Sequence, residues 1–126
     1  MNFPEELHYT KSHEWIRDLG GAVVQVGITD HAQDQLGDLV FVNLPEVGAE
    51  VVVGGTVADV ESVKAVSDIY SPVTGRIRAV NDTLRNAPEV INSDPFGAWI
   101  FEVENVTEND EYLSAADYEA FCESES

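Results

Sequence analysis

The stretch "VESVKAVSDIYSPVTGRI", residues 60–77, places a lysine between two segments that have the character of β-strands. "TVADVES" (56–62) leads into Lys64, and "RIRAV" (76–80), which alternates apolar and basic residues, follows it. Strand, turn and strand in this order predict a hairpin with Lys64 at its tip. No Asn-Gly or Gly-Gly pair marks the corner, so the turn residues do not decide the assignment, although a type I turn accepts most residues.

Lys64 is one of two lysines in the chain, and the other is Lys11. The ordinary role of an exposed lysine is a solvated surface charge. A lysine retained at a hairpin tip in a chain that has nearly lost this residue points to chemistry that arginine cannot perform, because a primary amine can be acylated. We expect Val63 and Val66 to point inward and hold the turn rigid while Lys64 points outward.

Outside this stretch the chain has further short strand patterns, bounded by Gly and Pro. They cover residues 22–28, 39–43, 50–53 and 98–104. Such strands predict a mainly β fold, either an antiparallel sandwich or a flattened barrel. "PEVGAEV" (45–51) and "PVTGRIR" (72–78) both carry Pro-x-x-Gly before a strand, which fits two similar halves packed face to face.

Two helices are predicted from their capping residues. Thr29 or Asp30 can cap the start of "HAQDQL", and Gly37 stands where a helix-terminating glycine belongs. Ser114 can cap "AADYEAFCE" near the end of the chain. Between residues 81 and 97, groups of Asn, Pro and Asp predict irregular chain.

The length of 126 residues predicts a single domain spanning 1–126, and the composition restricts its partners. There are 24 Asp and Glu against 6 Lys and Arg, for a formal net charge of −18. Such a surface repels nucleic-acid phosphates and anionic lipid, so we expect neither as a partner. No apolar run approaches the roughly 20 residues of a membrane span. The absence of a secretory signal and the lone Cys122 favour a reducing cytoplasm.

The three histidines offer no recognisable metal or catalytic motif. His13 is followed by Glu14 and His31 is preceded by Asp30, and adjacent residues point in different directions on a strand or helix. No H-x-x-x-H spacing occurs, so no metal site is expected at His8, His13 or His31. Cys122 has no nucleophile signature around it, and we therefore do not expect a stand-alone enzyme.

Several long motifs, taken in order, resemble one known family, the glycine cleavage system H proteins. They are "YTKSHEW" (9–15), "VGITDHAQDQLGDLVFVNLPEVG" (26–48), "ESVKAVSDIYSPVTGRI" (61–77), "VINSDP" (90–95) and "AWIFEVE" (98–104). The resemblance implies a lipoyl-type flattened β-barrel, also described as a hammerhead sandwich, with short helices that include a C-terminal one. It also implies that Lys64 carries lipoic acid in amide linkage.

By the same resemblance the protein is a non-catalytic carrier, and the chemistry belongs to its partners and their cofactors. A pyridoxal-phosphate glycine decarboxylase would load the aminomethyl group of glycine onto the arm, and a tetrahydrofolate-dependent aminomethyltransferase would remove it. A dihydrolipoyl dehydrogenase would then reoxidise the arm, and a lipoylating enzyme would have attached it. The expected state is a monomer.

A carrier of this kind benefits from a cleft that shields its cargo from water. The resemblance places Glu14, Asp68, Ser12 and His31 near the resting place of the arm. The two carboxylates would hold a protonated amine, and the serine would add a hydrogen bond. The competing interpretation of each carboxylate is an ordinary charge on an acidic surface.

Two alternatives remain open at this point. A biotin carrier shares the fold, but such carriers place Met on both sides of the lysine, whereas this chain has Val63 and Ala65 there and its only Met is Met1. The second alternative is a lipoyl donor for 2-oxoacid dehydrogenases, which the residues do not exclude.

The acidity has two explanations, adaptation to high salt and docking onto basic partners. Because the acidic residues are spread along the whole chain, we favour a salt-adapted prokaryotic source. The melting temperature should then rise between dilute buffer and molar salt, since salt screens self-repulsion. Equal melting temperatures in the two conditions would contradict this interpretation.

Overall fold

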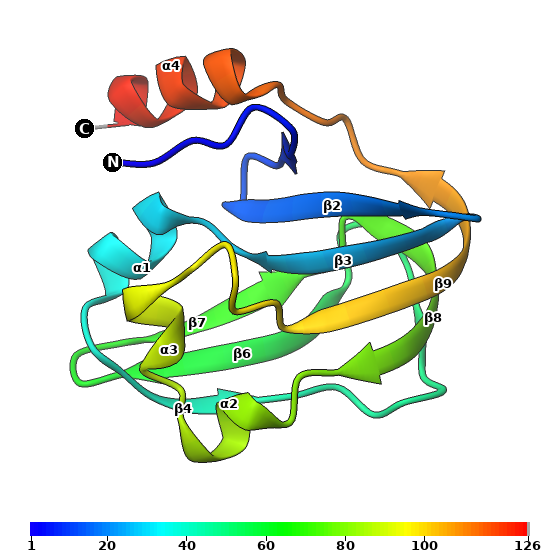
Figure 1. The fold of residues 1–126 in the computed structure, drawn as a ribbon, viewed down its shortest axis with the longest axis horizontal. Helices are drawn as coiled ribbons and strands as arrows, with labels where there is room; N and C mark the ends of the chain where they lie inside the picture. The colour runs from blue at the N-terminus through cyan, green and yellow to red at the C-terminus, as the bar shows by residue number, and fades with distance from the viewer. Residues whose placement is uncertain (126) are drawn as a thin grey trace.

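The computed structural model describes residues 1–125, so Ser126, the last residue of the expected domain, lies outside the described residues. Two antiparallel sheets form the body of the protein (Figure 1). In spatial order the larger sheet contains β1 (His8–Tyr9), β2 (Glu14–Gly20), β3 (Val23–Ile28), β9 (Phe101–Asn109), β8 (Val73–Val80) and β5 (Glu50–Val51). The smaller sheet contains β4 (Leu39–Asn43), β6 (Thr56–Ser62) and β7 (Val66–Tyr70). The predicted mainly β, two-sheet fold is confirmed.

Apolar residues on the facing sides of the two sheets make the main core. The larger sheet contributes Ile16, Val26, Ile77 and Val103, and the smaller sheet contributes Val42, Val60 and Ile69. In β8 the buried and exposed residues alternate in the period of a strand with one face on the core. The smaller sheet places β7 at its outer edge, and this edge borders the site described below.

Both predicted helices are present. In α1 (Asp30–Leu36) the cap is Thr29, whose hydroxyl oxygen accepts the N–H of Ala32, and Gly37 ends the helix at φ 83°. In α4 (Ala115–Glu125) the Ser114 hydroxyl accepts the N–H of Asp117. Local capping chemistry therefore located both starts.

The prediction of irregular chain between 81 and 97 was wrong in part. Two single-turn helices form there, α2 (Thr83–Asn86) and α3 (Val90–Ser93). Each buries one apolar side chain, Leu84 or Ile91, against the main core. Single turns that gain their stability from one buried contact carry no periodic sequence signal.

Some strands also differ from their predicted bounds. β9 begins at Phe101 instead of residue 98, because Ala98 bonds back to the carbonyl oxygen of Asp94 and so continues the turn after α3. β2 was not predicted, since Glu14, Trp15 and Ile16 are buried in succession and break the alternation. β5 ends at Val51, two residues before the predicted end.

The two Pro-x-x-Gly segments lie side by side within one sheet, and the packing of two similar halves face to face stays a prediction. β5 and β8 are antiparallel, with Glu50 opposite Arg76 and Val51 opposite Gly75. Ile77 extends the pairing by accepting the N–H of Gly48 and donating to the carbonyl oxygen of Ala49, at 2.8 Å in each case. The repeat therefore marks two neighbouring strands.

A second, smaller core lies where α4 and the N-terminal segment pack side by side over the edge of the larger sheet (Figure 1). Tyr9 and Tyr118 stack with ring centroids 4.7 Å apart, and Trp15 donates to the Pro95 carbonyl oxygen at 2.9 Å. Trp15 crosses the backbone at Gly27, where an added Cβ would lie 2.5 Å from the indole. This core fixes the start of β2.

Within residues 1–125, none of the helices has both the length and the apolar character needed to cross a membrane.

Candidate functional site

Lys64 lies at the tip of a hairpin, as predicted, but the second strand of that hairpin is β7, which was not predicted. The predicted second strand, 76–80, belongs to β8 in the larger sheet, so its role in the hairpin was wrong. Ser62 and Ala65 close the corner through an N–H to carbonyl bond of 2.8 Å, which leaves Val63 and Lys64 as the two corner residues. Neither has a positive φ, so the turn is not of the type I′ that requires it at both positions.

The prediction that Val63 and Val66 point inward was wrong, because their exposed fractions are 72% and 67%. Polar contacts hold the tip instead. The Ser62 hydroxyl oxygen accepts the N–H groups of Lys64 and Ala65 at 3.2 and 3.0 Å, and Val63 donates to the carbonyl oxygen of Asp38 at 3.1 Å. A hairpin corner projects beyond the sheet, so the core does not reach its side chains.

Asn92 of α3 ties together the chain segments beside the hairpin. Its amide donates to Gly37 O and Gln33 Oε1, and its side-chain oxygen accepts the N–H of Leu39 at 2.9 Å. The end of α1 and the start of β4 are thereby locked next to the tip. The Lys64 side chain lies along this junction, with its Cε 3.6 Å from where a Cβ on Gly37 would stand.

A cleft of about 370 Å³ opens between the start of β2, α1 and the outer edge of β7. All four residues expected near the arm line it, namely Ser12, Glu14, His31 and Asp68. Lys64 itself is not in the lining, but Leu36, which precedes Gly37, is. The structure therefore brings the four predicted residues together and places the lysine at their border.

Glu14 is the most buried polar group of the cleft, with an exposed fraction of 1%. Its Oε1 accepts the hydroxyl groups of Ser12 and Thr10 at 2.5 and 2.7 Å, and its Oε2 accepts the N–H of Tyr70 at 3.4 Å. These donors fix the carboxyl in place. Burial raises the pKa of Glu14 to about 7, and the hydrogen bonds from Ser12, Thr10 and Tyr70 oppose that rise.

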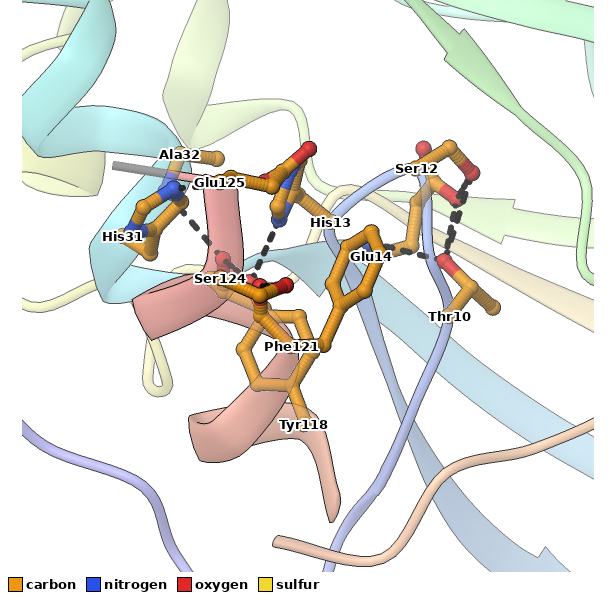
Figure 2. A network of polar contacts seen from close by, with 11 residues as sticks. Thr10, Ser12, His13, Glu14, His31, Ala32, Tyr118, Phe121, Ser124 and Glu125 are labelled. Carbon is orange, nitrogen blue, oxygen red and sulfur yellow. Dashed lines mark hydrogen bonds and ion pairs between the residues drawn. The ribbon is translucent and has the colours of Figure 1, made fainter.

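His13 and His31 meet beside the cleft, which the sequence spacing did not indicate. Their rings lie 4.7 Å apart, and His13 Nε2 contacts Glu125 Oε1 at 2.9 Å (Figure 2). On its other side, His13 Nδ1 hydrogen-bonds with the Tyr118 hydroxyl at 2.7 Å. His13 has a φ of 72°, unusual for a residue with a side chain. Burial lowers the pKa of His13, while Glu125 acts in the opposite direction.

The cleft suits a long, mostly apolar arm with a polar end. Its lining combines the apolar side chains of Ile28, Ala32, Leu36, Val60 and Ile69 with polar groups that include the carboxyl groups of Glu14 and Asp68 and the hydroxyl of Ser12. Apolar contact surface with fixed polar groups is the usual character of a small-molecule site. These residues fit a lipoyl group.

A two-sheet domain that presents a lysine on a hairpin beside such a cleft defines a carrier of a covalently attached arm. The family model described as Glycine cleavage H-protein matches residues 7–125. The chain belongs to this family, and the resemblance carried by its motifs is confirmed.

Individual relatives agree with this assignment. Glycine cleavage system H proteins of Lachnoclostridium phytofermentans and Citrobacter koseri are 51% and 53% identical, covering 99% and 98% of this chain and 98% of each relative. The crystal structure of a glycine cleavage system H protein from Mycobacterium marinum superposes with a TM-score of 0.87 at 43% identity. That match covers 93% of this chain and 96% of the other.

Family membership establishes the role in outline. The chain is a non-catalytic lipoyl carrier of the glycine cleavage system, and it carries lipoate covalently on a lysine. It works with the other glycine cleavage enzymes. The comparisons favour neither the biotin carrier nor the donor for 2-oxoacid dehydrogenases.

The burial of Glu14 predicts a pH effect on stability. Its pKa is about 7 in the folded chain against an ordinary value of 4.5, so the folded state holds more protons between these values. The free energy of unfolding therefore falls as the pH rises through this window, by about 3 kcal/mol for this group. Glu14→Gln should remove that part of the fall, as measured by urea unfolding from pH 4 to 8.

The matched control is Glu108→Gln, which changes an exposed carboxylate on β9. The free energy of unfolding of this variant should depend on pH as it does in the wild type. If the free energy of unfolding changed with pH in the same way in the wild type and in Glu14→Gln, Glu14 would titrate normally in the folded protein.

Proposed function

We propose that Lys64 is the lysine that carries the lipoyl group. The main support for this assignment is the position of Lys64 at a projecting hairpin tip that borders the cleft. The hydrogen bonds of Ser62 and the Asp38 carbonyl oxygen hold the backbone of the tip, so the mobile part is the side chain. A fixed base under a long arm gives a tethered substrate at high effective concentration.

We further propose that the chain's own residues shelter the aminomethyl cargo in the cleft. A bound lipoyl group supplies a disulfide that accepts the aminomethyl unit and becomes reduced. Glu14 and Asp68 would hold the protonated amine of the cargo, and Ser12 would orient the Glu14 carboxyl. His31 forms part of the wall. Enclosure keeps water from the labile carbon–nitrogen bond.

The roles of the two carboxyl groups differ because their surroundings differ. Glu14 is buried and held by three donors, so it cannot turn away from the cleft. Asp68 is exposed on β7, opposite Asp59 of β6 in the sheet register. We assign the fixed contact with the amine to Glu14 and a secondary, solvent-screened contact to Asp68.

We propose a cycle with three partners, a pyridoxal-phosphate glycine decarboxylase, a tetrahydrofolate-dependent aminomethyltransferase and a dihydrolipoyl dehydrogenase. A lipoylating enzyme acts beforehand. Their common target is the hairpin, whose exposed Val63 and Val66 flank the lysine and offer apolar surface to a partner. We propose that the protein acts as a single-domain monomer over residues 1–126, in the cytoplasm.

The two lysines of the chain allow a direct test of the attachment site. Lys64→Arg should abolish lipoylation, because the guanidinium group does not form the amide under these conditions. Lys11→Arg, which changes the other lysine, is the matched control and should be lipoylated like wild type. Intact mass of each protein after expression with lipoate measures the outcome, and a lipoylated Lys64→Arg protein would exclude the assignment.

Shelter by Glu14 is tested on the protein once it has been loaded with the aminomethyl group. Glu14→Gln should accelerate the spontaneous release of formaldehyde and ammonia by at least tenfold, because the amine loses its charged partner, which corresponds to about 1.4 kcal/mol. Asp68→Asn should have a smaller effect. The exposed carboxylate variant Glu108→Gln should release at the wild-type rate, and equal rates for all four proteins would remove both carboxyl groups from the site.

A further inference from the structure

Three parts of the chain that are far apart in sequence bring metal-binding side chains together beside the cleft. His13 comes from the turn before β2, His31 from α1 and Cys122 from α4. One potential ligand atom from each lies within 4.8 Å of the others. Figure 2 shows the two imidazoles with the Glu125 carboxylate between them. The role proposed above for the arm leaves His13, Cys122 and Glu125 unused.

The distances in this cluster are close to those that one metal ion requires. Glu125 Oε1 lies 2.9 Å from His13 Nε2 and 3.8 Å from His31 Nε2. Two ligands of a tetrahedral zinc ion lie roughly 3.3 to 3.7 Å apart, given metal–ligand bonds of about 2.0 to 2.3 Å. The ligand atoms of His13, His31 and Cys122, which lie within 4.8 Å of one another, therefore need to close by about 1 Å, which side-chain rotations can supply.

The hydroxyl groups of Tyr118 and Thr29 orient the imidazole ring of His13 within this cluster. The Tyr118 hydroxyl hydrogen-bonds with His13 Nδ1 at 2.7 Å, which leaves Nε2 directed at Glu125. The same hydroxyl is held by Thr29 Oγ1 at 2.6 Å. A partner on the other ring nitrogen is what fixes the orientation of a metal-bound histidine. Cys122 and Glu125 are three residues apart on α4 and so lie on one face.

We propose that His13, His31, Cys122 and Glu125 form a zinc site. Imidazole with a thiolate favours Zn²⁺ over Mg²⁺ or Ca²⁺, which prefer oxygen ligands. The thiolate and the carboxylate would balance the two charges of the ion. Four protein ligands leave no open position, which is the character of a structural site.

Such an ion would fasten the C-terminal helix to α1 and to the start of β2. At present α4 is joined to them by the His13 and His31 contacts with Glu125 and by the Tyr118 hydrogen bonds. His13 and His31 both line the cleft, so the ion would stiffen one end of it. This inference does not depend on the arm or on its attachment to Lys64.

The test uses the full chain without lipoate, reduced, stripped of metal and kept in excess Mg²⁺ to occupy surface carboxylates. One equivalent of Zn²⁺ should bind and raise the melting temperature. One equivalent of Co²⁺, used as a spectroscopic probe, should give a thiolate-to-metal charge-transfer band, which Cys122→Ser should abolish. His13→Gln and His31→Gln should each weaken Zn²⁺ binding at least tenfold, and Tyr118→Phe by roughly tenfold or more.

His8→Gln is the matched control, because His8 stacks on Tyr112 and lies outside the cluster. It should bind zinc like wild type. Absence of the charge-transfer band in the wild-type protein would overturn the site, whether or not the variants fold. Equal zinc affinity in Cys122→Ser, His13→Gln and His8→Gln would also overturn it, by showing that zinc binds to the acidic surface.

Discussion

The buried carboxyl group of Glu14 is the constraint around which the cleft and its surroundings are arranged. A carboxyl group costs free energy to remove from water unless hydrogen bonds replace its hydration. Here the preceding turn supplies the hydroxyls of Thr10 and Ser12, and β7 supplies the N–H of Tyr70. Since Glu14 belongs to the larger sheet and Tyr70 to the smaller one, the group joins the two sheets and defines the cleft between them.

Lys64 and Glu14 are held in opposite ways. A carrier needs both an accessible attachment point and a fixed group inside its cleft. Glu14 is enclosed and immobile, whereas Lys64 projects from a corner whose rigidity comes from backbone contacts to Ser62 and Asp38. Backbone anchoring leaves the corner side chains free of the core. The amine and the neighbouring valines are therefore all accessible to a partner, while the position of the hairpin remains fixed.

The C-terminal helix links the small core to the cleft. Tyr118 stacks on Tyr9 within that core, and its hydroxyl reaches Thr29 and His13 at the edge of the cleft. His13 adopts a backbone conformation that costs free energy for a residue with a side chain, and its hydrogen bond to Tyr118 helps to offset this cost. Packing of α4 and the geometry of the cleft are consequently coupled through one imidazole.

The local features of this protein were predictable from sequence. Capping residues located α1 and α4, strand patterns gave β4 and β6 with their bounds, and the scarcity of lysine singled out Lys64. Tertiary contacts decided the remainder. β2 escaped prediction because three successive residues are buried, Glu14 in the cleft, Trp15 in the second core and Ile16 in the main core. The prediction of inward-pointing valines was wrong because a hairpin corner lies beyond the reach of the core. The meeting of His13, His31 and Cys122 has no sequence signal, because their proximity arises only when the second core packs α4 against the edge of the larger sheet.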